Sequence, residues 1–298
     1  MIIQGRGLGL RREFASSLAN GPIRNDFDFL EVVPDNWMGL GGESMEQLDA
    51  IADKYPLVAH SLSLSIGDAQ PLDMNYLSAV KTFLDNYDIA IYSDHVSMSR
   101  DSCGYLYELI PVRRTQASLQ LMVDKIKAVQ DSLSRRIALE NISYYYDEEG
   151  QMAESEFIAR LIDASSCGLL LDVNNAYVNS RNHGFDPHMF IDALPTDAVT
   201  YFHVAGHLDN GPQERVLDTH GTDVSVAVLN LGAYAVHRFG EQPIVLERDN
   251  NIPSLDELCD ELRGIHEAMT GSTGIPRSCK VATYRRTVRS LTPISAAS

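Results

Sequence analysis

Histidines and carboxylates recur along this 298-residue chain directly after short runs of apolar residues. Imidazole nitrogens and carboxylate oxygens are the side-chain ligands that zinc, iron and related ions take in proteins. A single histidine at a strand end is usually a hydrogen-bonded packing residue, but eight such groups brought together would be hard to hold without cations. The predicted metal ligands are His60, His95, Glu140, Asp172, His203, Asp218, His220 and Glu247.

The number of these groups predicts a metal cluster. Four imidazoles and four carboxylates exceed what one tetrahedral ion needs and suit two or three ions. Glu140 and Asp172, at the ends of neighbouring predicted strands, are expected to bridge the ions. Iron fits this mixed set as well as zinc does, so the ligand types leave redox and hydrolytic chemistry both open.

Polar residues near these ligands are candidates for further contacts. Amide oxygens suit hard cations and amide NH₂ groups suit neighbouring carboxylates; we expect Asn175 to be a metal ligand and Asn174 a substrate contact. His183, in a polar loop, and His207, in a loop that contains Gly206, are further candidate substrate contacts.

Asp249 is the candidate general base. It follows Glu247 by two residues, which places both side chains on one face of an extended segment. From there it would take the proton of a substrate N–H group. The alternative interpretation is a surface carboxylate or an ion pair with Arg248.

The elements that must position these residues alternate between short apolar runs and amphipathic helical patterns, which is typical of parallel βα units. The predicted strands cover residues 5–10, 27–32, 57–61, 89–94, 136–140, 168–172, 199–203 and 243–247. The predicted helices cover residues 44–54, 73–87, 115–133, 155–164, 224–239 and 254–269. Eight strands predict a single (β/α)₈ TIM barrel, in which the carboxyl ends of all strands meet at one rim.

Two regions follow from this pattern. We expect residues 1–270 to form the barrel, with a capping box from Ser254 to Glu257 starting its last helix. Residues 271–298 carry five basic residues, no acidic residue and many Ser and Thr, and are predicted to form a flexible tail. The four cysteines are scattered, so they predict neither a disulfide framework nor a zinc ribbon.

Composition limits the partners. The hydrophobic fraction of 44% is typical of a globular protein, and the formal net charge of −17 argues against nucleic acid as a partner. We find neither a secretory leader pattern nor an apolar run of about 18 residues, and we therefore expect a cytoplasmic protein without membrane contact.

The order of the predicted ligands resembles that of the endonuclease IV and xylose isomerase-like TIM barrel superfamily. That order is His, His, Glu, Asp, His, an Asp-x-His pair and Glu, with Asp218 and His220 as the pair here. Asn175 stands where the three-metal endonuclease has a further histidine.

Longer motifs resemble a narrower family, the multinuclear non-haem iron-dependent oxidative enzymes. This group was formerly a domain-of-unknown-function family and includes the methanobactin biosynthesis protein MbnB. The resemblance covers residues 3–268. Its motifs here are Gly5–Arg11, Val33–Trp37, His60–Ser65, Leu171–Asn175, Asn182–Asp186, His203–His207 and Asp218–Gly221.

The resemblance implies two or three iron ions, in mixed Fe²⁺ and Fe³⁺ states, at the predicted ligands. It implies O₂-dependent oxidation of cysteine residues in a ribosomally synthesised precursor peptide, to an oxazolone with an adjacent thioamide or to a related heterocycle. It also implies a small partner protein that presents the peptide and forms a heterodimer with the enzyme.

Three other functions fit part of the pattern. A phosphodiesterase of the endonuclease IV type would use the same ligands to activate water, although the negative charge argues against its substrate. A sugar isomerase would need two metal ions and would give no clear role to Asp218-Thr219-His220. The third is a barrel that binds metal or recruits a partner without catalysis.

Overall fold

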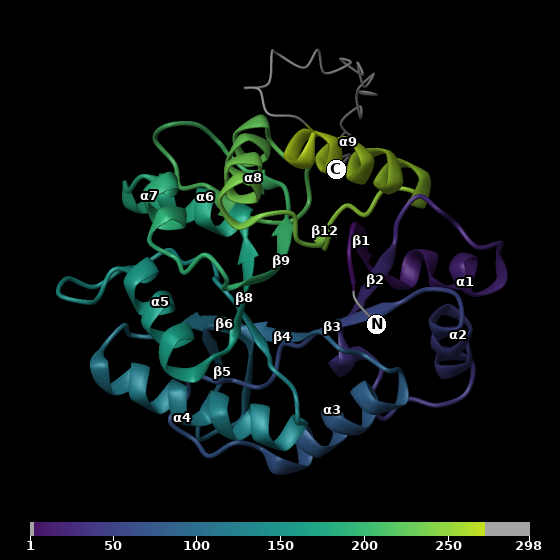
Figure 1. The fold of residues 1–298 in the computed structure, drawn as a ribbon, viewed down its shortest axis with the longest axis horizontal. Coiled ribbons are helices and arrows are strands. Elements are labelled where there is room, and N and C mark those ends of the chain that lie inside the picture. Colours follow the sequence, from purple (N-terminus) through teal and green to yellow (C-terminus); the bar gives the residue numbers. More distant parts are fainter. Residues whose placement is uncertain (1–2, 272–298) are drawn as a thin grey trace, which may run out of the picture.

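The computed structural model describes residues 3–271, and within them eight parallel strands close into a barrel (Figure 1). The strand order around the barrel is β1-β12-β9-β8-β7-β4-β3-β2. The barrel strands are β1 (Arg6–Gly9), β2 (Phe29–Val32), β3 (Leu57–His60), β4 (Tyr92–His95), β7 (Ala138–Glu140), β8 (Gly168–Asp172), β9 (Val199–Val204) and β12 (Ile244–Leu246). The predicted TIM barrel and all eight predicted strands are confirmed. The predicted tail, except Gly271, lies outside the described residues.

Helices surround the barrel and cover its strands (Figure 1). In the described part of the chain they are α1 (Arg12–Asn20), α2 (Glu43–Ala52), α3 (Met74–Asn86), α4 (Gln116–Leu133), α5 (Glu154–Ser165), α6 (Val173–His183), α7 (Pro187–Asp192), α8 (Val226–Phe239) and α9 (Leu255–Thr270), with a short 3₁₀ helix η1 (Pro34–Asn36). The six predicted helices are present within two residues at each end. Asp73, Thr115 and Ser225 cap three of them through side-chain oxygens, and the Ser254–Glu257 capping box is confirmed.

Helix α6 was not predicted, because its sequence is rich in asparagine, a poor helix former. Tertiary contacts offset that weakness. The amide of Asn179 accepts a hydrogen bond from Tyr144 N and donates one to Ile142 O, at 3.0 and 2.9 Å. The prediction that His183 lies in a loop is therefore wrong, because His183 is the last residue of this helix.

The alternation of side chains along the strands builds two inner layers. Six apolar or aromatic side chains form a small buried cluster separate from the main core: Phe29, Val58, Ala138, Leu170, Tyr201 and Val245. Two residues later in each case comes a polar side chain: Glu31, His60, Glu140, Asp172, His203 and Glu247. Because strand residues alternate between faces, both layers point into the barrel, and the polar layer lies at the carboxyl rim.

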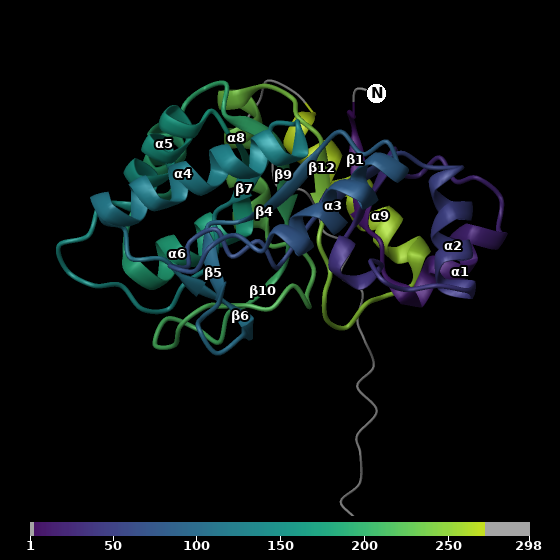
Figure 2. The ribbon, with the colours of Figure 1, turned by 90° about the horizontal axis from the view of Figure 1, so that it is seen from below.

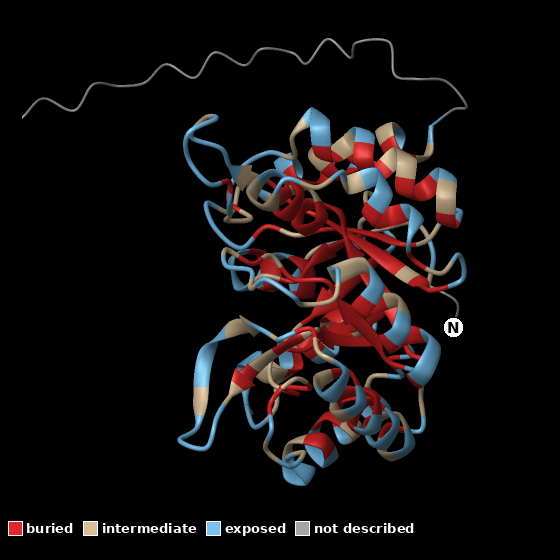
Figure 3. Cartoon of the chain, turned by 90° about the vertical axis from the view of Figure 1, so that its left-hand side faces the viewer, coloured by how far each residue is buried: buried red, intermediate tan, exposed pale blue. Residues whose placement is uncertain are grey.

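The main core lies between the strands and the surrounding helices, and Figure 3 shows the strands as buried. Two short hairpins lie beyond the strand ends, near the rim (Figure 2). One pairs β5 (Ser97–Arg100) with β6 (Tyr105–Pro111), and the other pairs β10 (His207–Leu208) with β11 (Leu217–Asp218). The prediction that His207 lies in a loop is thus wrong, because His207 pairs with Asp218 in an antiparallel hairpin and is a strand residue. None of the helices in residues 3–271 combines the length and apolar character needed to cross a membrane.

Candidate metal centre

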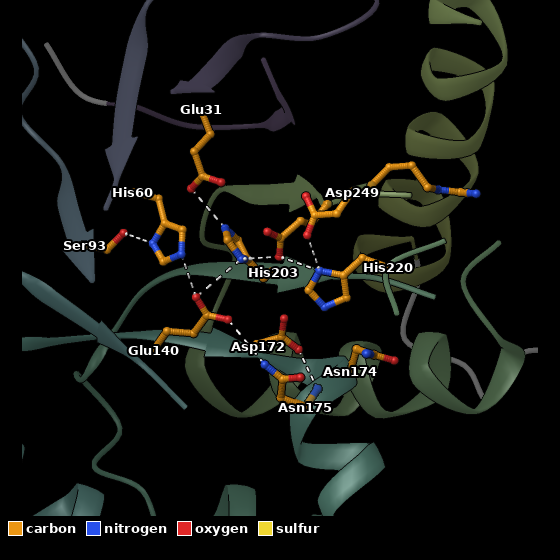
Figure 4. Close-up of polar contacts among 12 residues, drawn as sticks. Glu31, His60, Ser93, Glu140, Asp172, Asn174, Asn175, His203, His220 and Asp249 are labelled. Carbon is orange, nitrogen blue, oxygen red and sulfur yellow. Dashed lines mark hydrogen bonds and ion pairs between the residues drawn. The ribbon is translucent and has the colours of Figure 1, made fainter. Parts of the chain in front are cut away.

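The rim of the barrel brings seven of the nine predicted ligands, together with Asp249, into three adjacent groups, whereas Asn175 and Asp218 belong to none of them. Figure 4 shows His60, Glu140, Asp172, His203, His220 and Asp249 gathered at this rim. Within each group the ligand atoms lie within 4.8 Å of one another. The groups are His60, His95 and Glu140; then Glu140, Asp172, His203 and Glu247; then His220, Glu247 and Asp249. Glu140 and Glu247 each belong to two groups, whereas Asp172, the other expected bridge, belongs to one.

The first two groups are buried and their nitrogen and oxygen atoms converge. Glu140 Oε2 lies 3.0 Å from His60 Nε2 and 3.4 Å from His95 Nε2. His203 Nδ1 lies 3.1 Å from Glu247 Oε2 and 3.8 Å from Glu140 Oε2. These are the atoms that would donate lone pairs to a metal ion.

Several of these buried atoms have no hydrogen-bond partner, which is uncommon in a folded protein. Within the described residues, six such atoms belong to predicted ligands: His95 Nδ1, Glu140 Oε2, Asp172 Oδ2, Asn175 Oδ1, His203 Nδ1 and His220 Nε2. Each can offer a lone pair to a cation. The donor set therefore fits metal ions, and Asn175, predicted from the sequence, is among these residues.

Burial and neighbouring charges shift the proton affinities of the centre. Burial opposes the charged form of His60, but the hydrogen bond and the charge of Glu140 outweigh it and raise the His60 pKa to about 9. Burial, together with the charge of Glu140, raises the pKa of Asp172 well above its ordinary range. Burial also favours protonation of Glu140, but the charges of His95, His203 and His60 lower its pKa. A cation bound here would displace the protons of His60 and Asp172.

The third group lies nearer the surface and centres on His220. Its Nδ1 lies 2.9 Å from Asp249 Oδ2 and 3.3 Å from Glu247 Oε2, and its Nε2 lies 2.7 Å from Asp218 Oδ1. The other oxygen of Asp249 pairs with the guanidinium of Arg11. Asp249, the predicted general base, is therefore held between a histidine and an arginine. The sequence suggested an ion pair of Asp249 with Arg248, but the structure shows this ion pair with Arg11.

Asp218 is held by Asn174, which was predicted to contact substrate, and by Ser143. Asn174 Nδ2 donates to Asp218 Oδ1 at 2.8 Å, and Ser143 Oγ donates to Asp218 Oδ2 at 3.0 Å. His207 Nδ1 lies 2.7 Å from Asn174 Oδ1. His183 stacks on the ring of Tyr144, with centroids 4.3 Å apart.

A cavity of about 810 Å³ opens over the ligands. Its floor includes His60, His95, Glu140, Asn175 and His220, and its walls come from the β6 strand and the loop after β7. Asn174 and His183 do not line it but contact Asp218 and Tyr144, which do. His207 does not line it either and contacts Asn174. Arg11 is the one Lys or Arg among the lining residues in the part of the chain that the structure describes.

Sequence reasoning missed three buried residues beneath the centre: Glu31, Ser93 and Tyr201. Glu31 lies inside a predicted strand, two residues after Phe29, and so shares its inward face. A carboxylate at an inward position near the end of a strand was the signal that could have identified it.

Comparisons with known proteins agree with this geometry. Residues 5–270 match the family described as RiPP precursor modification enzyme MbnB/TglH/ChrH, where RiPP denotes a ribosomally synthesised and post-translationally modified peptide. A UPF0276 protein of Acinetobacter baylyi is 44% identical over 261 residues, which cover 88% of this chain and 90% of the relative.

Solved structures with a similar fold include xylose isomerase-like TIM barrels. A xylose isomerase-like TIM barrel/4-hydroxyphenylpyruvate dioxygenase fusion protein aligns with a TM-score of 0.62 at 14% identity, over 89% of this chain and 43% of that one. Endonuclease IV from Thermus thermophilus aligns with a TM-score of 0.56 at 14% identity, over 90% of this chain and 100% of that one. At these identities the likeness concerns the fold alone, whereas the match over residues 5–270 extends across the barrel and its ligand-bearing rim; the chain belongs to the MbnB/TglH/ChrH family of RiPP precursor modification enzymes.

Proposed function

We propose that this protein uses two or three iron ions and O₂ to oxidise cysteine residues of a ribosomally synthesised precursor peptide. The expected product is an oxazolone with an adjacent thioamide or a related heterocycle. The observation that carries the proposal is the chain of three ligand groups joined through Glu140 and Glu247, which suits neighbouring ions sharing carboxylates. Family membership supplies the peptide substrate.

The proposed metal ligands are His60, His95, Glu140, Asp172, Asn175, His203, Asp218, His220 and Glu247. When bound, iron in mixed Fe²⁺ and Fe³⁺ states would supply redox equivalents and a binding position for the cysteine thiolate. The chain holds six of these ligands at or directly after the ends of barrel strands, Asn175 in α6, Asp218 in β11 and His220 in the loop after β11. The members of the first two groups are almost fully buried, apart from Glu247.

Asp249 is proposed as the base that takes the proton of the peptide N–H. It lines the cavity and is partly exposed, so a substrate atom can reach it. Arg11 pairs with one of its oxygens and fixes the carboxylate in place. Asn174, His183 and His207 are proposed to act on substrate binding through their contacts with Asp218 and Tyr144, which line the cavity.

The cavity supports a peptide more than a phosphodiester. Its volume of about 810 Å³ is within the range of ligand sites and exceeds what one side chain needs. Leu62, Leu109 and Ile110 form an apolar part of its lining. Its one arginine is already paired with Asp249, so no free guanidinium in the described lining is offered to a phosphate.

A small partner protein that presents the peptide and forms a heterodimer with this chain completes the proposal, and we propose a cytoplasmic setting for the reaction. The alternatives, a hydrolase like endonuclease IV and a sugar isomerase, use the same fold with other metals. They become outcomes of the test below.

The test begins with metal analysis and Mössbauer spectroscopy of protein produced in iron-supplemented medium. Two or three coupled irons per chain are expected, with O₂ consumption when a cysteine-containing precursor peptide is added. Mass spectrometry of the peptide then identifies the oxidation. Tightly held zinc without iron, retained through anaerobic purification, would overturn the oxidase and favour the hydrolase.

A further inference from the structure

A buried chain of hydrogen bonds runs beneath the metal centre and ends at Glu31. Figure 4 shows its two ends, the contact of His60 with Ser93 and the contact of Glu31 with His203. His60 Nδ1 lies 2.8 Å from Ser93 Oγ, which lies 2.6 Å from Tyr201 Oη. Tyr201 Oη donates to Glu31 Oε2 at 2.8 Å, and the same oxygen lies 3.0 Å from His203 Nε2. All five residues are at most 4% exposed.

These contacts determine which atom donates the proton in each hydrogen bond. Tyr201 gives its one proton to Glu31, so Ser93 is the donor in its 2.6 Å contact with Tyr201, which is shorter than its 3.3 Å contact with Ala59 O. The Ser93 oxygen is then the acceptor for His60, whose Nδ1 carries the proton. At the other end, His203 Nε2 donates to the Glu31 carboxylate. Both histidine protons therefore point away from the ligand groups.

This assignment leaves opposite ring nitrogens free on the two histidines. His60 presents Nε2 to Glu140 at 3.0 Å, whereas His203 presents Nδ1 to Glu247 at 3.1 Å. The free nitrogen of each histidine faces a different ligand group, His60 the first and His203 the second.

We propose that Glu31 is a positioning residue for two metal positions at once. It orients His203 directly, and it orients His60 through Tyr201 and Ser93. A carboxylate behind a ligating histidine fixes the ring and strengthens it as a ligand. The inference rests on the metal centre of the proposed function, but it requires neither iron nor the oxidation of a peptide.

The burial of Glu31 supports this role. A carboxylate inside a barrel is costly unless its charge is compensated. Within the described residues, no Lys or Arg forms an ion pair with Glu31, and His203 is its one ion-pair partner. Cations held by His60 and His203 would supply the missing positive charge.

Four variants separate this role from a general effect of core mutation. Glu31→Gln keeps an acceptor oxygen but removes the charge. Tyr201→Phe interrupts the chain between Glu31 and His60 while leaving the bond from His203 to Glu31 in place. Two further variants serve as controls. Tyr92→Phe removes another fully buried hydroxyl of the barrel, and Glu154→Gln neutralises a half-buried glutamate that takes no part in this series of hydrogen bonds.

The probe is Co²⁺, titrated into metal-depleted full-length protein and followed by its visible absorption, with circular dichroism and thermal melting to verify the fold. A His95→Ala variant identifies which binding step belongs to the His60 position. Glu31→Gln should weaken both steps by about 10–100-fold, and Tyr201→Phe only the step of the His60 position. The control variants should bind as the wild type does.

Nitrogen NMR of the zinc-loaded protein provides a second measurement, because it reports which ring nitrogen binds metal. Metal on Nε2 of His60 and on Nδ1 of His203 supports the assignment, and the same nitrogen on both rings overturns it. Wild-type Co²⁺ affinity in a folded Glu31→Gln protein, or an equal loss in Tyr92→Phe, also overturns it. If metal binding depends on Glu31 but the metal-loaded protein does not oxidise the peptide, the proposed function is wrong and the role of Glu31 is still supported.

Discussion

The Nε2 atoms of His60 and His95 lie 3.1 Å apart at the buried rim of the barrel. Glu140 Oε2 is close to both, at 3.0 and 3.4 Å. Two imidazole lone pairs at this separation repel each other unless a proton or a cation lies between them. A divalent ion bound by all three atoms satisfies them together.

Metal binding should therefore compete with protons. The His60 pKa, raised from 6.5 to about 9, means that an ion must displace a proton from this ring at any pH below 9. Metal affinity should rise with pH, by about tenfold per pH unit for each proton displaced, and level off above pH 9. Chelator competition with Co²⁺ at pH 6.5, 7.5 and 8.5 measures this slope.

A control and a second measurement accompany that experiment. His188→Ala removes an exposed histidine and should leave the slope unchanged. Since the His60 pKa is higher in the folded chain, its protonation stabilises the metal-depleted fold fully below pH 6.5, and this stability is lost as pH rises through 9. An affinity that does not vary between pH 6.5 and 8.5 would contradict the assignment of His60 as a ligand.

The shared carboxylates should have a larger effect on metal content than the unshared one. Glu140 belongs to two ligand groups and Asp172 to one. Glu140→Gln should therefore lower the bound metal by about two ions per chain, and Asp172→Asn by about one. Elemental analysis after dialysis measures both, with Glu154→Gln as the control for a half-buried glutamate. Equal losses in the two variants would show that Glu140 does not join two ions.

Much of this centre could be predicted because barrel geometry makes strand ends converge. His60, Glu140, Asp172 and His203 each follow an apolar run, so residue type and position were sufficient. Glu31 was not identified, because its strand reads as an ordinary buried run and its partners, Tyr201 and His203, are about 170 residues away in the sequence. Contacts of that range depend on the closed barrel, in which only β1 and β12 separate β2 from β9.

The errors at His183 and His207 have a related cause. The local sequence around each is polar and favours a loop, but tertiary contacts decide the structure. Asn179 holds helix α6 against the loop after β7, and Asp218 pairs with His207 as the second strand of a hairpin. Neither of these contacts can be predicted from the helix or strand propensity of the local sequence.

The roles of Asp249 and Arg11 can be separated by substitution. Asp249→Asn should retain metal at the two buried groups and lose peptide oxidation by about 100-fold or more, because an amide cannot take a proton. Arg11→Met frees one oxygen of Asp249 and should lower turnover to a smaller extent, with Arg11→Lys intermediate. Metal content and single-turnover rates are measured together. Full turnover of Asp249→Asn at full metal content would exclude Asp249 as the base.

Glu154 should make the stability of the fold depend on pH near neutrality. Burial raises its pKa from 4.5 to about 7, although the charge of Arg114 and hydrogen bonds from Asn179 and Tyr144 favour the ionised form. The folded chain therefore holds this proton more tightly than the unfolded chain does, and the free energy of unfolding should fall as pH rises from 4.5 to 7. The contribution is about 1–3 kcal/mol, since the residue is half-buried.

Chemical denaturation of the metal-depleted protein at pH 5, 6, 7 and 8 measures this dependence. Glu154→Gln removes the titrating group and should flatten the curve, with a gain in stability that grows toward pH 8. Glu156→Gln, an exposed carboxylate in the same turn of α5, is the matched control and should keep the wild-type slope. Because Tyr144 packs between Glu154, Arg114 and His183, the loop after β7 should be the region whose hydrogen exchange responds to this proton. Parallel curves for the wild type and Glu154→Gln would show that the carboxyl ionises in the folded chain at its ordinary pH.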